Sequence, residues 1–156
     1  MKKSLEQLVE AGLIKPFEGS TAQVKARLEL AKRDIRVAKA TMAHDRDWAF
    51  SIAYNAILQA TRALMFAYGF RPAAGEGQHK AAVQFAEVVL GGEFAQDIHI
   101  FDKMRSKRHR VIYDTSGLIS QAEAKQAFNF AVRYVESVEK KLKSPTKPIS
   151  GKSPVP

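Results

Sequence analysis

Alanine recurs along residues 47–68 in steps of four and three residues, so one face of a helix carries only small side chains. Larger apolar side chains flank this face, and the stretch contains no glycine or proline. Either Asp45 or Asp47 can cap its first turn. The pattern predicts a buried central helix against which other helices pack closely. The alanines of this face are Ala49, Ala53, Ala56, Ala60, Ala63 and Ala67.

Helical periodicity predicts further helices at residues 4–14, 20–44, 79–90, 93–114 and 120–143. Three of them begin with capping-box spacing, in which a serine is followed three residues later by Gln or Glu. No segment alternates apolar and polar residues as a strand does. We therefore expect an all-α fold, an antiparallel helical bundle of about five to six helices. The capping pairs are Ser4 with Gln7, Ser20 with Gln23, and Ser120 with Glu123.

The predicted helix at residues 20–44 has one apolar face and one strongly basic face. We interpret the basic face as solvated, with a binding patch as the alternative. The basic residues are Lys25, Arg27, Lys32, Arg33, Arg36 and Lys39.

The length of 156 residues fits one domain, and we expect the bundle to occupy residues 1–143. Residues 144–156 hold four prolines and no acidic residue, so we expect a disordered basic tail there. The chain has no cysteine, which excludes disulfides and thiolate metal sites. It has no apolar run long enough to span a membrane and no apolar signal segment at its N-terminus. We expect a cytoplasmic protein that does not enter a membrane.

The formal net charge of +9 favours an anionic partner, such as nucleic acid, a nucleotide or an acidic protein surface. A basic protein without such a partner is the alternative. Charge alone does not separate the two.

The predicted helix at residues 93–114 carries an anomaly. The apolar spacing that begins at Phe94, Ile98 and Phe101 continues to Arg105 and Arg108. Both arginines are therefore expected on the face that enters the core. Burying an unpaired arginine is costly, so this placement indicates either a paired carboxylate or a water-filled site.

One explanation is functional. Arg105 and Arg108 would hold phosphate groups in a cleft, because guanidinium stays charged and can bind phosphate through two hydrogen bonds. His109 could transfer protons near neutral pH, and Tyr113 could donate a hydrogen bond or stack on a base.

The other explanation is structural. The helix would rotate out of the core, and the two arginines would pair with Asp34, Glu87 or Glu136, or with a partner subunit. Spacing alone favours this explanation slightly.

Three other polar or aromatic residues have simpler interpretations. His79 follows a glycine-containing loop and is expected to cap its helix rather than act in catalysis. Asn55 lies in an apolar helix and is either a buried contact or part of the cleft. Trp48 is expected in the core. The four histidines show no close pair at metal-binding spacing, so we expect neither a metal nor a cofactor.

Three segments together resemble the HEPN domain family over roughly residues 28–134. They are AYNAILQATRALMFAYGFRP, GQHKAAVQF and MRSKRHRVIYD. The resemblance implies an all-α bundle that forms a homodimer with its basic helices facing each other. Many HEPN domains are metal-independent ribonucleases of toxin or defence systems. Others are inactive or nucleotide-binding modules, often encoded with nucleotidyltransferases, so a nucleotidyltransferase or antitoxin is an expected partner.

The family's ribonuclease motif is an arginine, four to six residues, and then a histidine. Here Arg105 and His109 are separated by only three residues, and after Arg108 and four intervening residues the chain has Tyr113 in place of histidine. The resemblance assigns Arg108, His109 and Tyr113 to the positions of the catalytic motif. The cations around them are expected to bind nucleic acid. They are Lys103, Arg105, Lys107 and Arg110.

Three hypotheses follow from these observations. The first is a HEPN-like module that binds RNA or a nucleotide with a degenerate ribonuclease motif. The second is a metal-independent endoribonuclease. The third is a non-enzymatic module whose basic helix binds an acidic partner protein.

Overall fold

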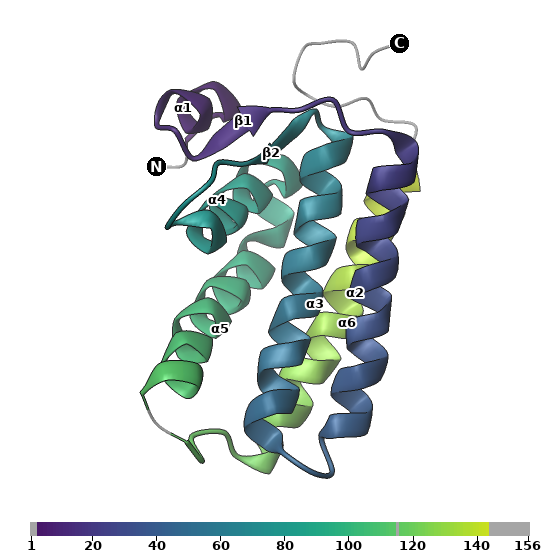
Figure 1. The fold of residues 1–156 in the computed structure, drawn as a ribbon, viewed down its shortest axis with the longest axis vertical. Coiled ribbons are helices and arrows are strands. Elements are labelled where there is room, and N and C mark those ends of the chain that lie inside the picture. Colours follow the sequence, from purple (N-terminus) through teal and green to yellow (C-terminus); the bar gives the residue numbers. More distant parts are fainter. Residues whose placement is uncertain (1–2, 115, 144–156) are drawn as a thin grey trace.

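The computed structural model describes residues 3–114 and 116–143. The tail predicted at residues 144–156 lies outside the described residues. Three long helices lie side by side: α2 (Thr21–Thr41), α3 (Arg46–Ala67) and α6 (Gln121–Lys143) (Figure 1). On another side of α3 lie α4 (Gln78–Leu90) and α5 (Ala95–Tyr113), which are joined by the short 3-10 helix η1 (Gly92–Phe94). The predicted all-α helical bundle is confirmed.

The alanine helix, α3, is the centre of this bundle. It contacts α2, α4, α5 and α6. Five of its six alanines are buried, and only Ala67 at the last turn is half-buried. Small side chains let the neighbouring helices approach closely, as the alanine spacing predicts.

Buried polar contacts fix α3 against its neighbours. The Asn55 amide donates a hydrogen bond to the Asp34 carboxylate of α2 at 2.8 Å. Thr61 donates to the Ile57 carbonyl, and the fully buried Tyr134 hydroxyl of α6 lies 2.7 Å from the Thr61 oxygen. Asn55 is therefore a packing contact, which was one of its two interpretations. Tyr134 was not among the core positions expected from the sequence.

The two acidic residues at the start of α3 have different structural roles. Asp45 caps the helix by accepting a hydrogen bond from the backbone N–H of Trp48 at 2.9 Å. Asp47 accepts hydrogen bonds from the backbone N–H groups of Gly117 and Ile119, so it ties the α5–α6 connection to α3. Trp48 is 58% exposed, so the expectation that it lies in the core is wrong.

All three predicted capping boxes form. The first helix, α1 (Leu5–Glu10), is shorter than predicted, since Gly12 turns the chain with a φ of 76°.

The expectation of no strands is wrong in one place. Strand β1 (Ile14–Pro16) pairs antiparallel with β2 (Phe70–Pro72), and Lys15 lies opposite Arg71. Each strand is only three residues long and ends in proline, so neither can show an alternating pattern. The pair joins the N-terminal segment to the end of α3.

Gly19→Ala is expected to lower the free energy of unfolding by about 1–3 kcal/mol. A Cβ at Gly19 would lie 3.0 Å from both the Cβ and the backbone oxygen of Phe66, so the chain leading into α2 would have to shift. Urea unfolding followed by circular dichroism measures the change. The control is Gly92→Ala, where an added Cβ meets open space. Equal effects of the two substitutions would contradict the close approach.

In the described part of the chain, no helix combines the length and apolar character needed to cross a membrane.

Candidate functional site

The buried face of α5 is rotated slightly from the face that the apolar spacing predicts. Its buried residues are Ile98, Phe101, Met104 and Val111. Met104 occupies the core position predicted for Arg105, and Arg105 lies half-buried at the edge. Arg108 lies between Met104 and Val111 along this face and is therefore directed toward α3.

Arg108 packs on an aromatic ring of α3 and lacks a charged partner. Its guanidinium carbon lies 5.5 Å from the centre of the Tyr54 ring, within the range of a cation–π contact. Its Nε is buried and has no hydrogen-bond partner among the described residues. Across residues 3–114 and 116–143, no carboxylate forms an ion pair with Arg108. The structural explanation in which Arg108 pairs with Asp34, Glu87 or Glu136 is therefore wrong, while pairing with a partner subunit stays a prediction.

Tyr54, on whose ring Arg108 packs, also contacts His79 of α4. The Tyr54 hydroxyl and His79 Nδ1 lie 2.9 Å apart, and the two rings stack with their centroids 5.6 Å apart. Tyr54 is fully buried, and burial raises its pKa, so its hydroxyl stays protonated at neutral pH. His79 is not the cap of α4; Gly77 occupies that position. The contact with Tyr54 replaces the expected capping role of His79.

Two further arginines lie around the Tyr54–His79 pair. Arg105 forms an ion pair with Asp102 of its own helix at 2.9 Å. Arg62 of α3 has a long contact of 3.5 Å between its Nη2 and the Gln78 side-chain oxygen. Burial first, and then the charges of Arg108, Arg62 and Arg105, lower the pKa of His79 from 6.5 to about 4. The site is therefore a cluster of cations around a neutral histidine.

Lowering the pH from 6.5 toward 4 is expected to destabilise the protein through His79. The unfolded chain binds a proton at this residue below 6.5, whereas the folded chain does so only near 4, so stability is full above 6.5 and falls across this window. With partial solvent exposure the loss is about 1–2 kcal/mol. Urea unfolding of wild type and His79→Gln at several pH values isolates the effect. Parallel pH curves for the two proteins would contradict the lowered pKa.

The remaining residues predicted for the site lie elsewhere on α5. His109 and Tyr113 are exposed and contact each other, with ring centroids 4.9 Å apart. Lys107 forms an ion pair with Glu123 of α6. The other two, Lys103 and Arg110, are exposed. The structure therefore brings Arg108 onto α3, with Arg105 one turn before it on α5, while His109 and Tyr113 are exposed and contact each other.

Sequence reasoning missed Tyr54, His79 and Arg62 as members of the cluster. The contact between Tyr54 and His79 joins residues 25 positions apart and has no local signal. Arg62 did carry a signal, because it is the single cation within residues 47–68, which the alanine spacing predicts to be a buried helix.

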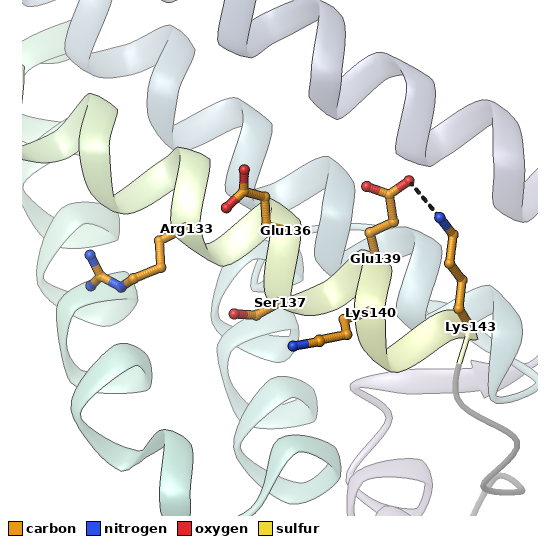
Figure 2. A pocket seen from close by; sticks show the side chains of 6 residues that line it. All are labelled: Arg133, Glu136, Ser137, Glu139, Lys140 and Lys143. Atoms are coloured by element: carbon orange, nitrogen blue, oxygen red, sulfur yellow. Dashed lines mark ion pairs between the residues drawn. The ribbon is translucent and has the colours of Figure 1, made fainter.

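A shallow hollow on α6 provides a comparison (Figure 2). It is lined by both acidic and basic residues, and Glu139 forms ion pairs with Lys143 at 3.7 Å and with Lys32 at 2.7 Å. Glu139, Lys143 and Arg133 each have an oppositely charged partner, unlike Arg108. Its lining residues are Arg133, Glu136, Ser137, Glu139, Lys140 and Lys143.

Arg62, Arg105 and Arg108, with Tyr54 and His79 between them, are called the arginine cluster below. This cluster has the hydrogen-bond donors needed to hold an anion. Guanidinium N–H groups and a neutral histidine can all donate to phosphate oxygens. Within the described chain, no group of three or more His, Asp or Glu residues lies in an arrangement that could hold a metal ion.

Two comparisons with known proteins bear on the identity of the chain. A search of curated proteins found no match. The family model of the HEPN domain matches residues 24–141, which is more than half of the chain and includes α3, α4, α5 and nearly all of α2 and α6. The match covers every residue of the arginine cluster. The chain therefore belongs to the HEPN domain family.

Proposed function

We propose that this HEPN domain is a non-catalytic module that binds the phosphate groups of RNA or of a nucleotide through Arg108. The phosphate would lie beside Tyr54 and His79, with Arg105 and Arg62 at its edges. RNA and nucleotides share this phosphate chemistry, and the experiment below distinguishes them.

The observation that carries the proposal is the unpaired state of Arg108. A partly buried guanidinium normally has a carboxylate partner, because removing its charge from water is costly. Among the described residues, Arg108 has an aromatic ring in that place and a buried Nε without an acceptor. An anionic ligand at the outer nitrogens of the guanidinium, which are not buried as Nε is, would supply the missing charge.

The geometry favours binding over catalysis. When the Tyr54 hydroxyl donates its hydrogen bond to His79 Nδ1, the proton of the neutral ring is on Nε2, which then acts as a donor to phosphate and not as a base. His109 is exposed and its ring contacts Tyr113. We therefore expect that no base is held in place for attack by a ribose hydroxyl at Arg108.

We also propose a homodimer, as the family resemblance implies, with the exposed α5 face of His109 and Tyr113 between the two copies. Tyr113 is 68% exposed and is one of three large hydrophobic side chains that the described part of the chain leaves in solvent. Sedimentation equilibrium of wild type and Tyr113→Asp tests this part separately. A wild-type protein that is monomeric at all concentrations would contradict it.

The test of binding is fluorescence anisotropy of a labelled single-stranded RNA with EDTA present, followed by gel analysis of the same samples. We expect binding without cleavage, and an affinity that falls steeply with salt, by a log–log slope of about 0.7 per phosphate contacted. Competition by an unlabelled mononucleotide decides between a strand and a nucleotide as the preferred ligand. Cleavage in EDTA would establish the ribonuclease alternative, and absence of binding to both ligands at physiological salt would overturn the proposal.

A further inference from the structure

A second pair of arginines lies where α2 meets α3. Arg27 of α2 is half-buried, and its Nη1 donates a hydrogen bond to the Gln59 side-chain oxygen at 2.9 Å. Its guanidinium carbon also lies 5.6 Å from the centre of the Phe66 ring. Gln59 is 9% exposed, so this hydrogen bond is nearly buried. Arg27 is thereby held on the surface of α3, although the sequence placed it on a solvated face.

Arg62 lies on the same surface of α3. It follows Gln59 by three residues and precedes Phe66 by four, which places all three on one side of the helix. Burial lowers the pKa of Arg62, and the positive charge of Arg27 lowers it further. Arg27 contacts both Gln59 and Phe66, which flank Arg62 on this side of the helix, so the two guanidinium groups are neighbours and repel each other.

Neither arginine has an acidic partner in the chain from residue 3 to 114 or from 116 to 143. The polar contacts of the pair go to the amide oxygens of Gln59 and Gln78, which are neutral. Two adjacent cations that are partly removed from water and lack a counter-charge are unfavourable. A bound anion would remove this cost.

We propose that Arg27 and Arg62 form a second anion-binding site, between α2 and α3, that takes a phosphate group. Guanidinium suits phosphate because its N–H groups match the spacing of two phosphate oxygens. The two glutamines position the guanidinium groups and carry no charge that would repel the ligand.

The second site adjoins the site around Arg108. Arg62 reaches the side-chain oxygen of Gln78, the residue before His79, so it lies near both sites. If the proposed function holds, a strand with one phosphate at Arg108 can place a neighbouring phosphate at Arg27 and Arg62. The second site itself does not depend on that function.

Inorganic phosphate is the first probe, at constant ionic strength, with detection of the arginine Nε–H signals by NMR. We expect the Arg62 signal to shift saturably in wild type, and Arg27→Gln to weaken the apparent affinity by about tenfold or more. Arg36→Gln, an exposed cation of α2, is the charge-matched control and should leave the titration unchanged. An Arg62 signal that does not respond to phosphate, or that responds equally in Arg27→Gln, would overturn the proposal.

The variant Arg108→Gln separates this site from the proposed function. A phosphate response of Arg62 that persists in Arg108→Gln supports an independent second site, even if wild type does not bind RNA. A response that disappears in Arg108→Gln but persists in Arg27→Gln would mean that only the first site exists.

Labelled single-stranded RNA is the second probe and identifies the source of the phosphate. An RNA affinity that falls in Arg27→Gln and not in Arg36→Gln assigns the second site to the strand. Unchanged RNA affinity, together with a phosphate response at Arg62, assigns it to a separate phosphate-bearing ligand.

Discussion

Arg108→Gln is expected to weaken binding of single-stranded RNA by about 10- to 100-fold. The substitution removes the charged contact to phosphate and leaves a shorter, neutral polar side chain. The same change should leave the free energy of unfolding within about 0.5 kcal/mol of wild type or raise it, since the lost charge is partly buried and has no ion-pair partner within the described residues. A substitution that weakens binding but does not lower stability is the result expected for a residue of a ligand site.

Anisotropy titrations and urea unfolding of the same preparations measure the two effects. Arg36→Gln, which removes an exposed positive charge from α2, controls for net charge. Equal losses of affinity in both variants would indicate nonspecific attraction between a basic protein and RNA. A marked loss of stability in Arg108→Gln would mean that Arg108 supports the fold, contrary to this account.

Ala60→Leu is expected to destabilise the bundle by about 3 kcal/mol. Ala60 is fully buried in the middle of α3, in the helix face whose small side chains allow close packing. Three additional carbon atoms have no space there, so a neighbouring helix must move or the leucine must adopt a strained rotamer.

Ala40→Leu is the matched control, because Ala40 is exposed on α2 and leucine is nearly as good a helix former as alanine. Its effect on urea unfolding should stay within about 0.5 kcal/mol. A similarly small effect of Ala60→Leu would show that α3 is not closely packed and would contradict its central position.

Most of the bundle could be predicted because its signals are local. The alanine spacing of α3 and the serine capping boxes each lie within a few turns of one helix, and both predictions are confirmed. The β1–β2 pair could not be predicted, since three-residue strands contain too few positions to show a period. Trp48 was misplaced because an apolar residue in an apolar helix need not face the core, and helix geometry alone did not fix the rotation of its first turn.

Only the site residues on α5 could be predicted from the sequence. Periodicity identified Arg105 and Arg108 as anomalies but could not decide the rotation of the helix, which buries Met104 and leaves Arg105 paired with Asp102. The residues on the other helices depend on tertiary contacts. His79 meets Tyr54 across α3 and α4, and Arg27 reaches Gln59 across α2 and α3. No local pattern encodes such contacts.

The most direct test of phosphate binding beside Arg108 is the pKa of His79, measured by NMR with and without a saturating nucleotide or short RNA. In the free protein, burial and three arginines lower this pKa to about 4. A phosphate bound among the same arginines should raise it by about one unit or more, because an anion favours the protonated ring. A ligand that binds with this shift would support the cluster as the binding site. A ligand that binds and leaves the pKa of His79 unchanged would contradict it.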